Sequence, residues 1–284
     1  MDKHTCISIF LTLLLLLCSR AGQSSEEAVK SNVSYASVTA LDFVPANEKM
    51  VYGDDNPGLQ YGLLWLPDNI GIVQKYPLVV LVHGGCWLNE YDIQHTFPLS
   101  SALAKAGYAV WSLEYRRTGD QGGGWPGSFE DIRQGIAFAS TLTDYPLDLD
   151  RMILMGHSAG GQLALLAASE YTNIAAVIGL AAITDIVGYS RGTNDCQTAT
   201  IDFMGGTYEQ QTAAYEAADP VGKPLQANTI LLRGDRDSIV PIAQSQLPGA
   251  TTKIQKGAGH FDWIHPGTGA YRLLLSTLTT LLQN

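Results

Sequence analysis

The sequence of 284 residues has few charged side chains, and the basic ones are the scarcer kind. Only 15% of the residues are charged, and 17 lysines and arginines stand against 27 aspartates and glutamates, for a net charge of −10. The basic residues are scattered, whereas a protein that binds DNA or RNA gathers them against the phosphate backbone. We therefore expect no nucleic acid as a partner. Hydrophobic residues make up 46% of the chain, which is typical of a folded globular protein.

Signals for a metal or a nucleotide are also missing from the sequence. The six histidines are not paired at ligand spacing, and neither Cys86 nor Cys196 has a neighbouring ligand. The glycine-rich segment from Gly122 to Gly124 lacks the lysine and the hydroxyl residue of a phosphate-binding loop. The sequence thus predicts no metal site and no cofactor.

Long apolar runs are missing after the first residues of the chain. Lys3 precedes an apolar stretch from Ile7 to Leu17, and Ser19-Arg20-Ala21 follows it, which is the pattern of a secretory signal peptide. The stretch is too short for a comfortable membrane span, and no later run approaches the roughly 20 residues that a transmembrane helix needs. We expect residues 1–21 to be a signal peptide, and the protein to be periplasmic or secreted without a stable membrane span.

Cleavage after Ala21 leaves a chain without an interrupting linker, so residues 22–284 are expected to form a single domain. Cys18 offers an alternative lipid anchor, although Leu17 directly before it fits a lipobox poorly. The mature chain keeps two cysteines, Cys86 and Cys196, and an oxidising compartment favours a disulfide between them over two buried thiols.

Hydrophobic patterns along the chain indicate an α/β protein. Two segments alternate like half-buried strands and would form an antiparallel sheet edge, namely Val33 to Leu41 and Gln60 to Leu66. Continuous apolar runs typical of central parallel strands follow at Leu78 to Val82, Ala109 to Leu113, Met152 to Met155, Ala175 to Leu180 and Thr229 to Leu232, with a short strand near Thr251 to Ile254. Helix candidates between and after them are Leu99 to Ala106, Phe129 to Thr141, Gly161 to Ser169 and Tyr271 to Leu282. This alternation predicts a mostly parallel, doubly wound sheet with helices on both faces.

The segment Gly156-His157-Ser158-Ala159-Gly160 follows one of these strands and precedes a helix. It matches the G-x-S-x-G nucleophile elbow, a sharp turn in which the serine takes a strained, positive φ and exposes its hydroxyl. A serine needs a histidine as base and a carboxylate that orients the histidine. Because ligands bind at the carboxyl ends of parallel strands, these partners are expected after other strands.

Several residues could fill each of these roles. Asp237, Asp235 and Asp185 follow strands, and the order serine, acid, histidine belongs to this architecture. The alternative for the latter two is a carboxylate in a turn or a helix cap. For the histidine, His260, His265 and the more remote His95 are available.

The motifs together resemble those of the α/β-hydrolases, from about Gln60 to the C-terminus. Within that superfamily, His83-Gly84-Gly85-Cys86-Trp87, Glu114-Tyr115-Arg116 and Gly156 to Gly161 are similar to those of the esterase, lipase and kynurenine formamidase-like group, which has feruloyl and acetyl esterase relatives. The resemblance implies a serine hydrolase that cleaves small-molecule carboxylic esters through an acyl-enzyme. An amide hydrolase of formamidase or peptidase type, or a catalytically inactive binding protein on the same fold, are the alternatives.

The resemblance also assigns roles to single residues. Asp237 matches the family's acid, since Gly234 precedes it and Pro241 follows, and His260 alone fits the glycine-x-glycine-histidine pattern. The catalytic set is then Ser158, Asp237 and His260, and the oxyanion hole is formed by Gly84, Gly85 and Ala159. His157 and His83 are expected to pack or brace structurally and not to act as bases.

Two further regions follow strand ends. Trp87 and Trp125 could line a substrate pocket, although Trp125 could instead cap the core. Ser190 to Thr207 falls where this fold commonly inserts a small lid, and a bond from Cys196 to Cys86 would tie that lid beside the glycine loop.

Overall fold

A computed structural model describes residues 30–68, 75–226 and 228–283. The predicted signal peptide and Cys18 lie outside the described residues. None of the described helices combines the length and the apolar character needed to cross a membrane.

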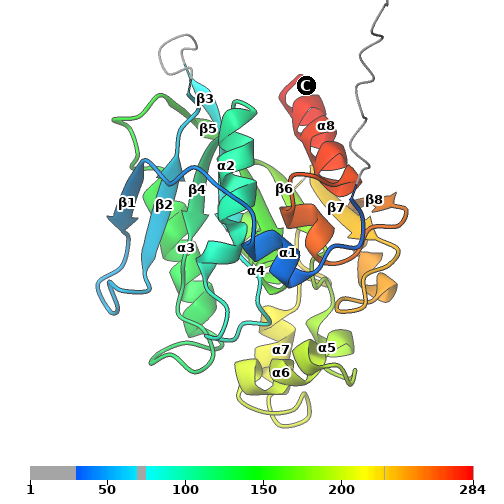
Figure 1. The fold of residues 1–284 in the computed structure, drawn as a ribbon. Helices are drawn as coiled ribbons and strands as arrows, with labels where there is room; N and C mark the ends of the chain where they lie inside the picture. The colour runs from blue at the N-terminus through cyan, green and yellow to red at the C-terminus, as the bar shows by residue number, and fades with distance from the viewer. Residues whose placement is uncertain (1–29, 69–74, 227, 284) are drawn as a thin grey trace, which may run out of the picture.

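One sheet of eight strands forms the centre of the molecule (Figure 1), in the order β1-β2-β4-β3-β5-β6-β7-β8. The strands are β1 (Glu48–Val51), β2 (Tyr61–Trp65), β3 (Tyr76–Val82), β4 (Ala109–Leu113), β5 (Leu147–His157), β6 (Ile174–Leu180), β7 (Thr229–Gly234) and β8 (Thr251–Gln255). β2 runs antiparallel to both β1 and β4, and all pairs from β4 to β8 are parallel. The strand order reverses between β3 and β5, which is where ligands bind in open sheets of this kind.

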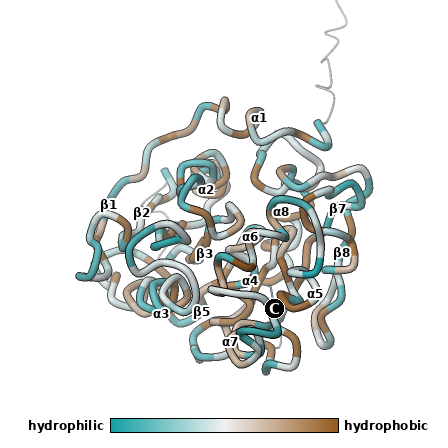
Figure 2. Tube along the Cα trace, turned by 90° about the horizontal axis from the view of Figure 1, so that it is seen from below, coloured by the Kyte–Doolittle hydropathy of each residue, from teal (hydrophilic) through white to brown (hydrophobic). Residues whose placement is uncertain are grey.

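Helices cover both faces of the sheet, as the sequence predicts. α1 (Tyr35–Thr39), α2 (Phe97–Lys105) and α8 (Gly269–Gln283) lie on one face, and α3 (Gly127–Ala139) and α4 (Ala159–Ala167) on the other (Figure 1). Alternate residues of β3 enter the two cores, with Val80 in one and Leu81 in the other, because side chains alternate along a strand. Seen along the sheet, hydrophobic segments gather near the middle around β3 and α4 (Figure 2).

The predicted strand from Val33 to Leu41 is wrong. Residues 35–39 form α1, whose N-cap Ser34 accepts a hydrogen bond from the Ser37 amide. Only Val38 of this helix is buried. The alternation of apolar residues in this segment therefore does not mark the buried face of a strand. β1, which the sequence analysis missed, forms the antiparallel edge instead, and three of its four residues are exposed.

The insertion between β6 and β7 carries three helices and lies beyond the end of the sheet (Figure 1). They are α5 (Ile186–Tyr189), α6 (Asp195–Met204) and α7 (Thr212–Ala218), so the insertion is longer than the predicted segment. Cys196 of α6 forms a disulfide with Cys86, which ties the insertion to the loop after β3. Short 3-10 helices complete the fold at η1 (Ile93–Thr96), η2 (Ala168–Glu170), η3 (Ile242–Ser245) and η4 (Phe261–Ile264).

Candidate active site

Ser158 sits in a tight turn between β5 and α4. Its φ of 56° and ψ of −120° lie in a region that non-glycine residues rarely adopt. Glycine is required beside it, because a Cβ on Gly160 would lie 2.2 Å from the carbonyl oxygen of His83. The absence of a side chain at Gly160 thus allows β3 and α4 to approach closely, and the strained serine is held at the carboxyl end of β5.

His260 and Asp237 form a buried pair at the ends of β8 and β7. The His260 Nδ1 atom lies 2.8 Å from Asp237 Oδ2, and their side chains are 6% and 2% exposed. The other carboxylate oxygen, Oδ1, accepts hydrogen bonds from the amides of Ile239 and Val240. Burial works to raise the pKa of Asp237, but His260 and the two amides outweigh it, so the pKa lies below its ordinary value. Asp237 is therefore an ionised acceptor that fixes the ring of His260.

A cavity of about 160 Å³ brings the serine and the histidine together. Ser158 and His260 both line it, at the reversal point of the strand order. The other lining residues are mostly aromatic or apolar: Tyr35, Gly85, Cys86, Tyr91, His95, His157, Ile239 and Phe261. Three of the predicted positions, Ser158, His260 and Gly85, thus share one cavity, and Asp237 stands directly behind His260.

The loop after β3 runs beside the serine. A Cβ on Gly84 would lie 3.0 Å from the Ser158 Cβ, and one on Gly85 would lie 2.4 Å from the Tyr91 Cβ. Gly85 also has a φ of 105°, which favours glycine. In the described part of the chain, the amides of Gly85 and Ala159 donate to no protein acceptor. Two N–H groups near the serine are thus available to a ligand oxygen.

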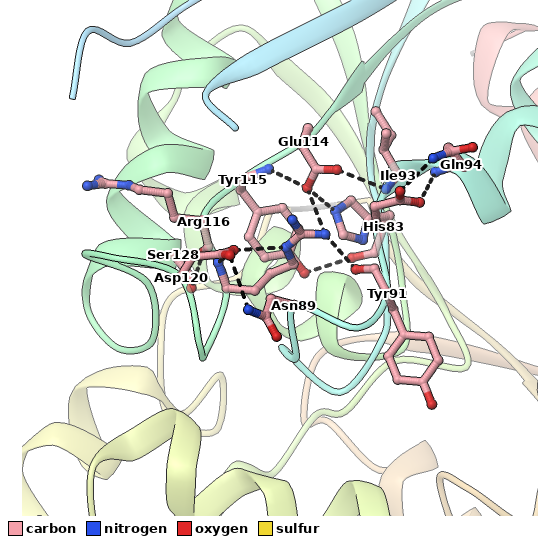
Figure 3. Close-up of polar contacts among 12 residues, drawn as sticks. His83, Asn89, Tyr91, Ile93, Gln94, Glu114, Tyr115, Arg116, Asp120 and Ser128 are labelled. Carbon is pink, nitrogen blue, oxygen red and sulfur yellow. Dashed lines mark hydrogen bonds and ion pairs between the residues drawn. The ribbon is translucent and has the colours of Figure 1, made fainter. Parts of the chain in front are cut away.

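A buried charged cluster holds this loop from behind (Figure 3). His83 Nδ1 lies 2.8 Å from the Gly84 carbonyl oxygen, and His83 Nε2 lies 3.0 Å from Glu114 Oε1. Both partners are hydrogen-bond acceptors, so each ring nitrogen of His83 faces a fixed acceptor. Arg117 lies 3.3 Å from the same carboxylate and donates to the Tyr91 carbonyl at 2.7 Å. His83 thus braces the loop, as the sequence analysis expects.

Glu114 is the centre of that cluster. Its carboxylate also accepts the amides of Ile93 and Tyr115, each at 3.0 Å. Burial works to raise the pKa of Glu114, but His83, Arg117 and the Ile93 amide together bring it below its ordinary value. The sequence analysis placed Glu114 in a motif without giving it a role.

Two more buried histidines lie next to the cavity, and both are neutral. Burial lowers the pKa of His157 well below its ordinary value and that of His95 to about 3. His157 Nε2 donates to the carbonyl oxygen of His260 at 3.0 Å, which leaves its Nδ1 as an acceptor without a partner. These residues pack the site without making a pair with a carboxylate.

The other candidates for acid and base have local roles in turns. Asp185 caps α5 by accepting the Gly188 amide at 2.6 Å, and Asp235 accepts the Gly257 amide at 2.6 Å. His265 Nδ1 accepts the Gly267 amide at 2.9 Å. None of the three lines the cavity at Ser158.

The two tryptophans expected at the substrate pocket, Trp87 and Trp125, do not line that cavity. Trp87 is fully buried, donates to Gln162 Oε1 at 3.1 Å and stacks on Phe203 of α6 with ring centres 4.7 Å apart. Trp125 stacks on Phe129 at 5.4 Å. Both rings pack beneath or beside the inserted helices. An aromatic side chain that follows a strand end was therefore not a sufficient signal for a residue of the pocket wall.

The sequence analysis missed the residues that do form the walls. Tyr35 comes from α1, and Phe261 from η4, directly after His260. Tyr35 lies in the segment predicted as an edge strand, so no signal linked it to a site. Groups of histidine, cysteine, aspartate or glutamate that could hold a metal ion are not found within the described residues.

Known proteins with similar sequences include esterases and dipeptidyl peptidases. The sequence profile of the BD-FAE family matches residues 64–248. The chain is 24% identical over 248 residues to esterase LipQ of Mycobacterium tuberculosis, which covers 79% of this chain and 58% of LipQ. It is 27% identical over 201 residues to dipeptidyl peptidase 8 of Homo sapiens, with 66% of this chain and 22% of that protein covered. The chain thus matches less than two thirds of the length of each of these relatives.

Solved structures share the fold over nearly the whole chain. Esterase B from Lactobacillus rhamnosis superposes with a TM-score of 0.70 at 21% identity, covering 88% of this chain and 90% of that one. A truncated carbohydrate esterase from gut microbiota gives a TM-score of 0.70 at 18% identity, with 84% and 98% covered. Since the family profile covers more than half of the sequence and the fold agrees, this chain belongs to the BD-FAE family of α/β-hydrolases.

Proposed function

We propose that the protein is an exported serine hydrolase that cleaves carboxylic esters through an acyl-enzyme. The observation that carries this proposal is the His260–Asp237 pair, 2.8 Å apart, whose histidine shares a cavity with the strained Ser158. The names of similar proteins, among them esterases LipQ and LipC, support the ester as substrate.

Each residue has a defined part in the proposed reaction. His260 Nε2 takes the proton of the Ser158 hydroxyl while the serine oxygen attacks the carbonyl carbon of the ester. Asp237, held ionised by its hydrogen bonds, keeps the Nδ1 proton of His260 in place and balances the charge of the imidazolium. The imidazolium then donates its Nε2 proton to the leaving alcohol, and an acyl-enzyme remains. Water deprotonated by His260 then attacks the acyl carbon, the bond to the serine oxygen breaks as His260 returns the proton to that oxygen, and the carboxylic acid leaves.

The glycine loop supplies the anion site in this proposal. The amides of Gly84 or Gly85 and of Ala159 would hold the oxygen that becomes negative when the carbonyl carbon turns tetrahedral. The lack of protein acceptors for the Gly85 and Ala159 amides supports this role. Preorganised donors of this kind stabilise the transition state by about 3 kcal/mol each.

Hydrolysis of amides is the second candidate, since the same machinery can attack either carbonyl group. The similarity to dipeptidyl peptidase 8 favours it. Measuring kcat/KM on an acyl ester and on the matched N-formyl aromatic amide separates the two. A higher value for the amide would reverse the order of the candidates.

Substitution of the serine tests the proposal directly. Ser158→Ala should lower kcat for p-nitrophenyl acetate by at least about 10,000-fold and abolish labelling by a fluorophosphonate probe. The midpoint of urea unfolding should stay near that of the wild type. Ser276→Ala, at an exposed position on α8, is the matched control and should change neither quantity. Wild-type turnover by Ser158→Ala would reject the assignment.

Export is proposed on the N-terminal sequence pattern and is supported by the disulfide between Cys86 and Cys196. The mass of the mature N-terminus after expression in a host with a secretion system tests it. Cleavage after Ala21 is expected, whereas a lipid-modified Cys18 would identify an anchored form.

A further inference from the structure

The N-terminal segment packs against the candidate active site. We call residues 30–41 the N-terminal strap. Its helix α1 contacts η1 and η4, and it lies on the same face of the sheet as α2 and α8 (Figure 1). The strap lies outside residues 64–248, the range that the family profile matches. Its contribution to the site is therefore a feature of this chain that the profile does not describe.

Tyr35 is the residue of the strap that reaches the cavity. Its ring centre lies 5.7 Å from that of Tyr91, 5.8 Å from that of His95 and 5.5 Å from that of Phe261. All four of these residues line the cavity that contains Ser158. Tyr35 thus joins three separate wall residues, and its ring occupies space that a longer ligand would need.

The cavity is small for a hydrolase of aromatic esters. Its volume of about 160 Å³ is close to that of an engineered protein cavity that holds one benzene, and below the 300 Å³ or more of sites for larger ligands. A feruloyl group combines a substituted ring with a three-carbon chain and exceeds this volume. The walls are aromatic and apolar, and His95 and His157 are neutral. The space therefore suits a short, uncharged acyl chain.

Asp262 holds the strap in this position. Its carboxylate is almost fully buried and accepts the amides of Asn32 at 2.8 Å and of Val33 at 2.9 Å. The same carboxylate accepts the Gly259 amide at 3.1 Å, next to His260. One buried anion thus fastens the strap and the histidine loop together. The position of Tyr35 relative to His260 is set through Asp262.

We propose that Tyr35 is a specificity-determining residue that limits the acyl group to short chains, and that Asp262 is the positioning residue that keeps Tyr35 in place. This inference rests on the proposed ester hydrolysis at Ser158. It adds that the N-terminal strap, which lies far in sequence from the catalytic motifs, selects the substrate.

The test compares kcat/KM on p-nitrophenyl acetate, butyrate and octanoate and on a feruloyl ester. The wild type should favour acetate over octanoate by at least about 100-fold, and Tyr35→Ala should reduce that ratio by about tenfold or more. Tyr35→Phe should keep the wild-type ratio because the ring remains. Phe43→Ala removes a half-exposed aromatic ring that follows the strap and does not line the cavity, so its ratio should also be unchanged.

Two different failures can be told apart in this experiment. Absence of turnover of every ester by the wild type would reject the proposed function. Turnover of acetate by both proteins, with the same chain-length ratio in the wild type and Tyr35→Ala, would overturn the role of Tyr35. If Tyr35→Ala does not fold, as judged by urea unfolding, Tyr35→Leu keeps part of the packing and should show a smaller change in the same direction.

A double-mutant cycle tests the role of Asp262. Asp262→Asn should lower the acetate-to-octanoate ratio, chiefly through a lower KM for octanoate. Tyr35→Ala should change the ratio less in this background than in the wild type, because the two residues act on the same wall. Effects that multiply independently would show that Asp262 does not act through Tyr35.

Discussion

Two buried histidine–carboxylate pairs lie near the candidate active site, and they differ in what the second ring nitrogen of the histidine faces. His83 lies 3.0 Å from Glu114, and His260 lies 2.8 Å from Asp237. Both carboxylate side chains are 2% exposed, and each accepts two backbone amides. In the first pair, however, the second ring nitrogen of His83 donates to the Gly84 carbonyl oxygen. The second nitrogen of His260 has no such partner among the described residues, and the ring lines the cavity.

This difference separates a histidine that holds a loop in place from a histidine that can act as a base. A histidine whose two ring nitrogens both face fixed acceptors has no nitrogen open to a substrate, so His83 can only hold the glycine loop. A histidine with one nitrogen open to a cavity can take a proton from a neighbouring hydroxyl. A buried pair with a carboxylate is thus common to both roles, and the free nitrogen distinguishes them.

Removing each histidine should produce opposite effects, and this is the largest difference that we expect. His260→Gln should lower kcat for p-nitrophenyl acetate by about 10,000-fold with little change in stability. His83→Gln should lower the free energy of unfolding by about 1–3 kcal/mol and reduce kcat far less. Initial rates and urea unfolding of both variants provide the measurement. Equal losses of kcat at equal stability would remove the distinction between the pairs.

The free energy of unfolding should depend more on the carboxylate of the His83–Glu114 pair than on that of the His260–Asp237 pair. Glu114→Gln removes the buried anion between His83 and Arg117, so among the described residues Arg117 keeps only its ion pair with Asp120. The expected loss of unfolding free energy is about 3–5 kcal/mol, measured by urea unfolding. Glu170→Gln is the matched control, because its ion pair with Arg133 is partly exposed, and it should cost less than about 1 kcal/mol. A loss as small for Glu114→Gln would show that the cluster is not needed to hold the loop.

The turn at Ser158 and the N-terminal strap differ in how far they could be predicted from the sequence. Strand runs, the turn at Ser158 and the order of the residues after each strand predict local structure, because glycine and apolar periodicity act over a few residues. The alternation from Val33 to Leu41 misled, since α1 buries a single residue and owes its place to the long-range bonds of Asp262. Tyr35 and Asp262 are 227 residues apart, so no local pattern could bring them to one site.

The disulfide adds a covalent tie on the glycine-loop side alone. It joins Cys86, two residues after Gly84, to Cys196 of the inserted α6, 110 positions further along the sequence. Replacing both cysteines by serine should lower the free energy of unfolding by about 2–4 kcal/mol. Urea unfolding of the variant and of the wild type, each with and without reductant, measures the effect. Loss of stability on reduction in the variant without Cys86 and Cys196 as well would show that the reductant acts elsewhere.

The smallest expected effect concerns pH and the neutral histidines between the two pairs. The pKa of His95, lowered to about 3 by burial, lies below the 6.5 of an unfolded chain. Between these values the unfolded chain binds a proton that the folded protein does not, so His95 contributes stability that is complete above pH 6.5 and is lost as the pH falls. His157, whose pKa is also lowered by burial, acts in the same direction.

Replacing His95 should therefore flatten the acid side of the stability profile. In His95→Phe, the slope of unfolding free energy against pH between 6.5 and 4.5 should be smaller by up to about 1.4 kcal/mol per pH unit. The phenyl ring keeps the contact with Tyr35 and removes the titrating imidazole of residue 95, and urea unfolding at several pH values gives the slope. Below that range, Asp237 and Glu114, with lowered pKa values, lose their own stabilising charge in both proteins alike. Equal slopes in the two proteins would mean that His95 carries a proton in the folded state as it does in the unfolded chain.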